Sequence, residues 1–95
     1  MEPTSKGTRT VIEMPPIEYP RLSKRMNETG VVLVRVYIDE RGLPSVVELA
    51  KSSGFARLDD AAVAGLKKFR FKPMTENGRP LAGWARIPVP FELEK

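Results

Sequence analysis

The sequence contains neither cysteine nor histidine. Without cysteine the chain has no thiol nucleophile, and without histidine it lacks the commonest general acid or base at neutral pH. Together the two absences also remove the usual zinc and haem ligands. Most enzyme classes are therefore excluded, and we expect no enzymatic activity, no metal site and no cofactor. Because cysteine-free proteins occur in oxidising and reducing compartments alike, the composition indicates no location.

Long apolar runs are absent too. No segment approaches the roughly 20 apolar residues of a membrane-spanning helix, and the N-terminus lacks the apolar stretch of a signal peptide. The chain instead opens with the polar letters MEPTSKGTRT, so we expect residues 1–14 to be a disordered lead-in or the remnant of a linker. The remaining residues, 15–95, suffice for one domain with a single hydrophobic core.

The charge is only mildly one-sided. Sixteen Lys and Arg residues against twelve Asp and Glu residues give a net charge of +4, which indicates no particular partner. The segment KKFRFK, residues 67–72, interleaves basic residues with Phe69 and Phe71, a pattern that can bind nucleic acid. Because Phe69 fits the apolar stripe of a helix and lysines favour a helix C-terminus, we interpret the segment as structural and expect no nucleic-acid partner.

The first half of the domain predicts an arm, a helix and a hairpin. Three prolines in residues 15–20 favour an extended arm, and a short helix over 20–28 follows, with Leu22 and Met26 on one face and Gly30 at its end.

The hairpin begins with residues 31–38, where apolar residues occupy both faces, as in a central strand. A turn at Gly42 leads to a second strand, 45–51, whose Val47 and Leu49 are predicted to point inward.

Residues 57–69 have the apolar spacing of an amphipathic helix. Small residues in it, including Gly65, would let this helix lie close to the sheet. The next segment, 71–83, contains two prolines and an Asn-Gly pair and is predicted to be a loop with a turn. The expected buried stripe of the helix is Leu58, Ala62, Leu66 and Phe69.

The last segment, RIPVPFEL, residues 86–93, alternates apolar and polar positions as a half-buried strand does. Pro88 and Pro90 lack a backbone N–H, so this strand should lie at an edge with both prolines turned to the open side. We therefore predict an α+β domain, a three-stranded antiparallel sheet in the order 2-1-3 with two helices packed on one face.

Two polar motifs are weak candidates for chemistry. The SSG segment, residues 52–54, has no G-x-S-x-G frame and no histidine to activate a hydroxyl, so a role in the loop or at the helix entry is favoured. Asp59 and Asp60 are neighbours on a helix and point about 100° apart, which suits a metal ion poorly. We expect both carboxylates to be structural, since negative charge complements a helix N-terminus.

Two aromatic residues are candidates for partner contact. Trp84 points away from the core-facing residues of the last strand, which suits either an interface or a cap on the preceding loop. Tyr19 lies in the arm between a carboxylate and a proline, where it could contact a partner or pack the arm onto the domain. The sequence leaves both alternatives open for each residue.

Over residues 15–93 the chain resembles the C-terminal domain of TonB-type energy transducers. The resemblance rests on YP before the first helix, GVVLVRVYIDERGLPSVVEL for the hairpin, SSGFARLDDAAVAGLKKFRFKP for the loop, helix and exit, and IPVPFEL for the last strand. A common form of the arm in this family is Gln-Pro-x-Tyr-Pro. Tyr19 and Pro20 match it, whereas Pro16 stands at the Gln and Ile17 at the first Pro, so no side-chain amide is available there.

The resemblance implies a function and a location. Such proteins are anchored in the inner membrane by an N-terminal helix, cross the periplasm on a proline-rich linker and are driven by an ExbB–ExbD motor. Their C-terminal domain is periplasmic and binds the TonB box of outer-membrane receptors as a strand added to its sheet, transmitting force for the uptake of siderophores, haem or cobalamin. A homodimer is a further option for the domain.

A similar accessory domain that binds periplasmic proteins or cell-wall material without transducing energy is the rival interpretation. For the favoured interpretation, the expected partner-binding residues are Pro16, Glu18, Tyr19, Pro20, Trp84, Arg86, Ile87, Pro88, Val89, Pro90 and Phe91.

Overall fold

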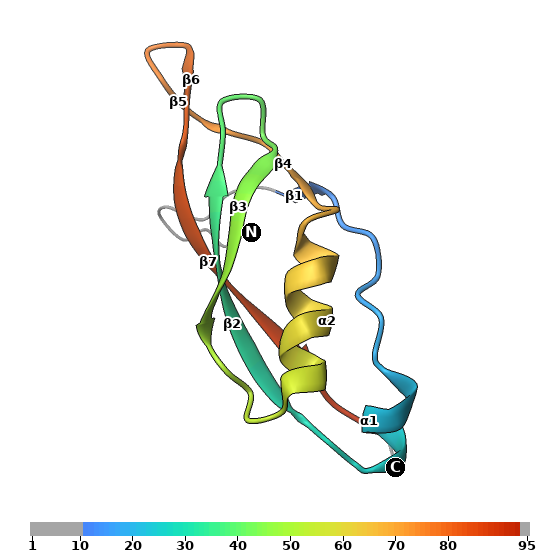
Figure 1. Cartoon of the computed structure of the whole chain (residues 1–95). Helices are drawn as coiled ribbons and strands as arrows, with labels where there is room; N and C mark the ends of the chain where they lie inside the picture. The colour runs from blue at the N-terminus through green and yellow to red at the C-terminus, as the bar shows by residue number, and fades with distance from the viewer. Residues whose placement is uncertain (1–10, 94–95) are drawn as a thin grey trace.

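The computed structural model describes residues 11–93, with side chains from residue 14 onward. Figure 1 shows three long strands side by side, α2 in front of them and the arm, residues 14–20, running along α2. The strands are β1 (Val11–Glu13), β2 (Gly30–Ile38), β3 (Pro44–Lys51), β4 (Arg70–Phe71), β5 (Met74–Glu76), β6 (Arg79–Leu81) and β7 (Gly83–Phe91), and the helices are α1 (Arg21–Arg25) and α2 (Ala56–Leu66).

The main sheet has the strand order β3-β2-β7, with both pairs antiparallel. The hairpin, the central first strand and the edge position of the last strand are therefore confirmed. β7 starts at Gly83, earlier than predicted, because residues before Arg86 continue the pairing with β2 as far as Ile38.

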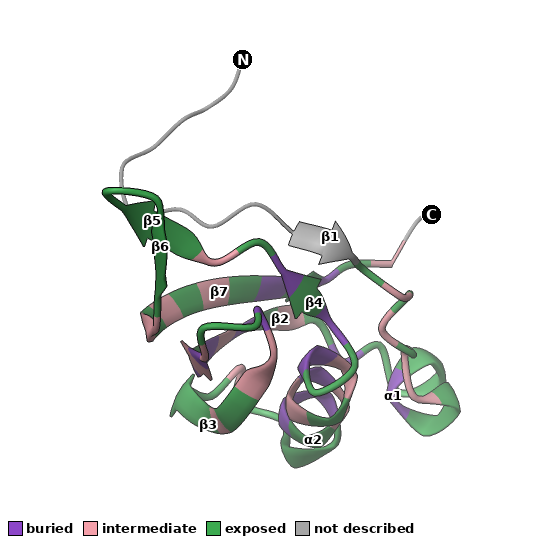
Figure 2. Ribbon diagram, turned by 90° about the horizontal axis from the view of Figure 1, so that it is seen from above, coloured by how far each residue is buried: buried purple, intermediate pink, exposed green. Residues whose placement is uncertain are grey.

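The core lies between β2, β7 and α2. From Val32 to Ile38 every second residue of β2 has an exposed fraction of 0%, and the stripe predicted for the helix is buried as well. In Figure 2 the buried positions gather on the sides of the sheet and of α2 that face each other. The core residues are Val32, Val34, Val36, Ile38, Leu58, Ala62, Leu66, Phe69, Phe71, Val89 and Phe91.

Helix α2 contacts both β2 and β3, whereas the packing of α1 on the same face stays a prediction. The inward direction predicted for β3 holds for Val47, which packs against the core, but is wrong for Leu49, which is 45% exposed. β3 is an edge strand that shifts register against β2 between Leu33 and Val34, so its residues are covered less completely than those of a central strand.

Helix α1 is shorter than predicted and buries a different face. Asn27 adopts a left-handed backbone conformation, with φ at 57°, and so prevents the helix from reaching Gly30. Leu22 and Met26 are exposed, and Ser23 is the buried residue of the helix; its hydroxyl is satisfied by donating to Glu28 Oε1 at 2.8 Å.

The segment predicted as a loop, residues 71–83, is largely strand. β5 and β6 form an antiparallel hairpin whose turn residues Asn77 and Gly78 both have positive φ, 53° and 78°. This is the geometry of a type I′ turn, for which Asn-Gly is the preferred pair. The signal was present in the sequence, but the two neighbouring prolines obscured the short strands.

The small residue Gly65 of α2 faces the arm. A Cβ atom built on Gly65 would lie 2.7 Å from Ile17 Cγ1, so the missing side chain lets the arm lie directly on the helix. The prediction that small residues bring the helix close to the sheet is therefore wrong for Gly65, because the side of α2 that carries Gly65 faces Ile17.

The lead-in predicted over residues 1–14 is partly described. Residues 11–13 form β1, which pairs with β4 in antiparallel fashion, and Val11 and Ile12 are of the β-branched type common in strands. Residues 1–10 lie outside the described part of the chain.

The turn between β2 and β3 is fastened to the core. Asp39 Oδ1 accepts from the N–H groups of Arg41 and Leu43, each at 2.9 Å, and the Phe71 N–H donates to the Gly42 carbonyl at 2.9 Å. These hydrogen bonds, led by the one from Leu43, hold the pKa of the Asp39 carboxyl below its usual range. The turn is thus a fixed part of the domain.

Candidate functional site

The open side of β7 is a sheet edge close to the arm. β7 pairs with β2 on one side, and no described strand pairs with it on the other. Its exposed residues are Trp84, Arg86, Pro88 and Pro90, and they alternate with the half-buried or buried residues Ala85, Ile87, Val89 and Phe91.

The two prolines fit this arrangement. Pairing with β2 continues without a register shift through Pro88, opposite Leu33, and Pro90, opposite Val31. Because proline has no N–H, the bonds to β2 must come from the residues in between, such as Val89. The direction predicted for both prolines agrees with this register.

The open edge accepts more hydrogen bonds than it donates. The carbonyl groups of all four exposed residues face outward, but only Trp84 and Arg86 also present an N–H on that side. A strand placed beside β7 can therefore exchange bonds in both directions near Arg86, and can only donate to β7 near Pro88 and Pro90.

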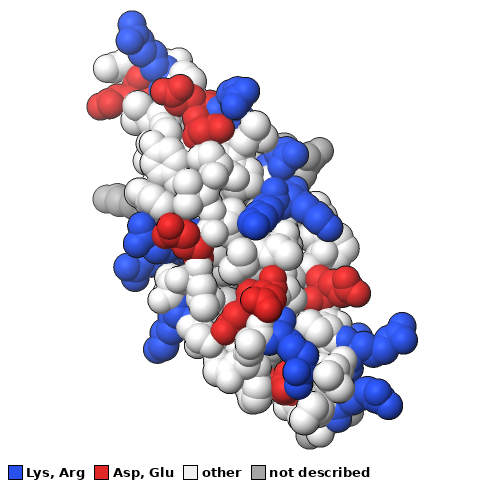
Figure 3. All heavy atoms as spheres, viewed as in Figure 1, with Lys and Arg blue, Asp and Glu red and all other residues white. Residues whose placement is uncertain are grey.

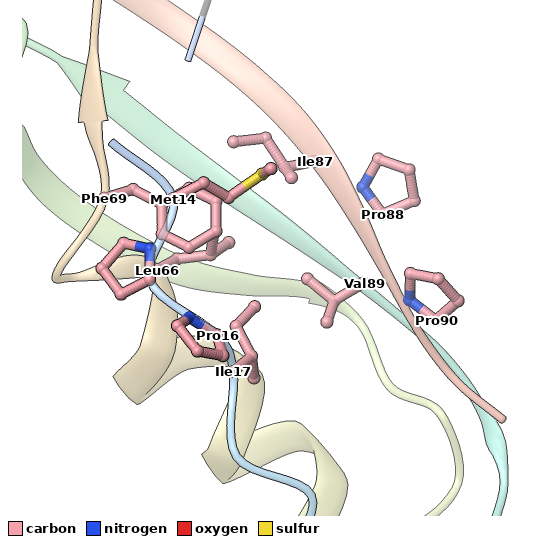
Figure 4. A pocket seen from close by; sticks show the side chains of 10 residues that line it. Met14, Pro16, Ile17, Leu66, Phe69, Ile87, Pro88, Val89 and Pro90 are labelled. Carbon is pink, nitrogen blue, oxygen red and sulfur yellow. The ribbon is translucent and has the colours of Figure 1, made fainter. Parts of the chain in front are cut away.

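An apolar groove of about 360 Å³ lies between the arm and β7. In Figure 4, Ile87 and Val89 point toward the arm, whereas the rings of Pro88 and Pro90 point away from it. The groove is lined by Met14, Pro15, Pro16, Ile17, Leu66, Phe69, Ile87, Pro88, Val89 and Pro90. It could receive apolar side chains of a segment that lies along the edge.

The arm is held in place by Tyr19. The edge of its ring meets Phe91, with ring centroids 5.1 Å apart, and its hydroxyl donates to the Glu28 carbonyl. Burial, and then the negative charge of Glu28, raise the pKa of the Tyr19 phenol. The structure thus contains the packing role that the sequence left open, and direct contact of Tyr19 with a partner stays a prediction.

An ion pair between Glu28, which follows α1, and Arg57 of α2 was not predicted. Glu28 is only 7% exposed, and its carboxylate accepts from the Ser23 hydroxyl and pairs with Arg57 Nη2 at 3.0 Å. The sequence offered no signal for it, because Glu28 and Arg57 are far apart along the chain.

The other predicted site residues fall into two groups. Pro16, Glu18 and Pro20 line a shallow hollow over the small residues of α2, on the arm itself. Phe91 is 4% exposed, so its side chain belongs to the core and could affect a partner only indirectly.

Trp84 lies at the other end of the edge. It is 48% exposed, and its ring meets Tyr37 on β2 at a centroid distance of 5.2 Å. The Arg35 guanidinium carbon lies 4.2 Å from the centre of the Trp84 ring, a cation–π geometry. The ring therefore packs across the sheet face away from α2 and still presents half of its surface to solvent.

The serines at the entry of α2 and Asp59 form one hydrogen-bonded cluster. Asp59 accepts from the Ser52 hydroxyl, and from the Ser53 N–H and hydroxyl at 2.9 Å each. Burial alone would raise the pKa of the Asp59 carboxyl, but these three bonds together hold it below its usual range. The structural roles expected for the serines and Asp59 are consistent with these hydrogen bonds.

We expect Asp59→Asn to lower the free energy of unfolding by about 1.5–3 kcal/mol, because it removes bonds to a buried charged group. Asp60→Asn, at an exposed position, should change it by less than about 0.5 kcal/mol. The folded-state pKa of Asp59 is depressed, so its contribution is present above its unfolded pKa near 3.9 and is lost as pH falls through the folded value. Urea unfolding of both variants from pH 7 to pH 3 would test this; equal losses at pH 7 would contradict it.

Nucleic-acid binding receives no support from the basic segment at residues 67–72. Phe69 and Phe71 are 4% and 2% exposed, so neither ring can stack on a base. On the face seen in Figure 3, Lys and Arg side chains lie among Asp and Glu side chains.

Within the described residues there is no group of acidic side chains placed to hold a metal ion. No helix in the described part of the chain has the length and apolarity needed to cross a membrane.

Comparison with known proteins gives consistent matches. The family model described as "Gram-negative bacterial TonB protein C-terminal" matches residues 15–93. Protein tonB2 of Pseudomonas aeruginosa is 39% identical over 79 residues, which are 83% of this chain and 29% of that protein. Protein TonB of Vibrio cholerae is 33% identical over 76 residues, 80% of this chain and 31% of that protein. The chain thus spans less than a third of the length of these relatives.

A solved structure agrees with the fold. The solution NMR structure of the Pseudomonas aeruginosa TonB C-terminal domain superposes with a TM-score of 0.73 at 26% sequence identity, covering 95% of this chain and 91% of that one.

Proposed function

The chain belongs to the family of Gram-negative bacterial TonB protein C-terminal domains, and from this membership we propose that it is the receptor-binding domain of a TonB-type energy transducer. In this proposal the domain is periplasmic, an inner-membrane anchor and an ExbB–ExbD motor supply the force, and outer-membrane transporters for siderophores, haem or cobalamin receive it. The domain acts by binding and pulling, without catalysis.

The open edge of β7 carries the proposal. A receptor segment in extended conformation adds to β7 as a further strand, with main-chain hydrogen bonds giving affinity and side-chain contacts giving selectivity. The apolar groove beside Ile87 and Val89 favours apolar side chains on the inner face of that segment. The arm, with Pro16 and Tyr19 close to the same strand, flanks the bound peptide.

We expect a cognate peptide to change the amide NMR signals of residues 84–91 and of the arm. Peptides from the N-termini of outer-membrane receptors of the same organism would be titrated into the labelled domain. Because β3 is the other edge of the sheet, its residues, 44–51, are the internal control and should remain unchanged. Changes confined to β3 would show that the peptide docks at β3 and that the assignment of the docking edge to β7 is wrong.

The rival accessory role has its own outcome. If no receptor peptide changes any amide signal, while peptidoglycan fragments or a periplasmic protein do, the domain is a binding module outside energy transduction.

A further inference from the structure

Every polar group of Glu28 makes a hydrogen bond within the domain. Its backbone N–H donates to the Ser23 carbonyl at 2.9 Å, and its own carbonyl accepts from the Tyr19 hydroxyl. One carboxylate oxygen accepts from the Ser23 hydroxyl at 2.8 Å, and the other accepts from Arg57 Nη2 at 3.0 Å. These partners belong to α1, to the arm and to α2. Glu28 therefore joins three separate segments of the domain.

The side chain of Glu28 and the carbonyl that receives Tyr19 cannot move independently. Glu28 is 7% exposed, and a buried carboxylate that loses a charged partner is strongly destabilised. Without Arg57, the carboxylate would turn toward water. That turn would displace residues 26–29 and, with them, the carbonyl that accepts from Tyr19.

The arm can transmit such a displacement because it is stiff. Three prolines within residues 14–20 fix their φ angles. Figure 1 shows the arm running from α1 along α2, where Ile17 lies against Gly65. A shift at Tyr19 is therefore passed along the arm to residues 14–17.

The far end of the arm is a wall of the apolar groove. Residues 14–17 line the groove on one side and residues 87–90 of β7 on the other, and the two walls face each other in Figure 4. Leu66, which also lines the groove, is the last residue of α2, whereas Arg57 is in the first turn. Glu28 and Arg57 lie outside this lining, so they can affect a bound segment only through the position of the arm.

We propose that Glu28 and Arg57 are positioning residues for peptide binding, because their ion pair holds the arm at the separation from β7 that the groove needs. The inference rests on the proposed docking at β7. It adds two residues that do not line the groove, and a route from Arg57 through Glu28 and Tyr19 to the arm, by which a change at the start of α2 reaches the docking edge.

The first measurement needs no peptide. We expect Arg57→Gln to shift the amide NMR signals of Ile17 and Glu18 in the free domain. Arg41→Gln is the matched control, because Arg41 also pairs with a carboxylate, that of Asp39, and the substitution removes the same charge. It should leave the arm signals in place. If Arg57→Gln leaves them in place as well, the ion pair does not position the arm and the inference is wrong.

The second measurement is the affinity for a receptor peptide that shifts the signals of residues 84–91. Arg57→Gln should weaken binding about three- to tenfold, and Arg41→Gln by less than about twofold. Tyr19→Phe removes the hydroxyl but keeps a ring beside Phe91, and should cause a loss similar to that of Arg57→Gln. Because both changes act through the arm, the double variant should lose no more than the larger single loss. Losses that multiply would contradict the shared route.

Arg57→Lys keeps the charge and should lose less affinity than Arg57→Gln. Urea unfolding checks that each variant is folded; if Arg57→Gln is not, Arg57→Lys takes its place in the comparison with Tyr19→Phe.

The outcomes separate this inference from the proposed docking. If the arm signals shift but the peptide affinity is unchanged or rises, the positioning role is wrong and strand addition stands. If no receptor peptide perturbs β7, the docking edge and the positioning role are both wrong.

Discussion

Gly42→Ala should lower the free energy of unfolding by about 3 kcal/mol or leave the domain unfolded. A Cβ atom at this position would lie 1.9 Å from the Phe71 carbonyl oxygen, and the backbone has φ at +85°, where side chains are strained. Neither partner can easily withdraw, because the Phe71 N–H donates to the Gly42 carbonyl and the Phe71 ring is 2% exposed. Urea unfolding of the variant measures the loss.

Gly78→Ala is the matched control. Gly78 has nearly the same φ, +78°, but a Cβ atom there would meet nothing within 4 Å. Only the conformational strain should then count, at about 1 kcal/mol. If the two variants lose the same stability, the close approach of Gly42 to Phe71 contributes nothing.

Replacing Pro88 and Pro90 together by Ala should strengthen peptide binding about tenfold, strengthen self-association of the domain, or do both. The change restores two outward N–H donors on an exposed edge, and each added hydrogen bond contributes about 0.5–1.5 kcal/mol net. It also removes a feature that discourages indiscriminate strand pairing. Peptide titration and sedimentation of the double variant, compared with the parent, measure the two effects.

Pro80→Ala provides the comparison for proline removal elsewhere, since Pro80 is exposed on β6 and lies outside β7. Pro80→Ala should change neither peptide affinity nor self-association by more than about twofold, because it adds no donor to the docking edge. If the β7 double variant is less stable and gains neither affinity nor self-association, the prolines face inward and β7 is not the docking edge.

The sequence predicted the elements whose evidence lies in local periodicity. The two apolar faces of residues 31–38 identified the central strand, the stripe from Leu58 to Phe69 identified α2, and the two prolines identified the edge. These signals are local, because burial on one or both sides selects the residue types of a single element.

Local periodicity could not predict contacts between segments that are distant in sequence. Nothing in the composition of α2 showed that Gly65 receives Ile17, and nothing in the turn showed that Gly42 touches Phe71. The pairing of Arg35 with Arg86 likewise depends on strand register. Periodicity reports which side of an element is buried, whereas the identity of what covers it depends on the tertiary fold.

If the domain is pulled from its N-terminal side, as the proposed function requires, the hydrogen bond and ring contact of Tyr19 have a mechanical consequence. Its hydrogen bond joins residues nine apart in sequence, with α1 in the loop between them. Tension that enters through the arm would pass from Tyr19 to Glu28 through the hydrogen bond and to Phe91 through the ring contact. Helix α1, which lies between Tyr19 and Glu28 in sequence, would carry no load. Glu28 lies two residues before the start of the central strand and is tied to α2 through Arg57. Under such a pull the sheet and α2 would be loaded together, and α1 would extend only after the Tyr19 contact breaks.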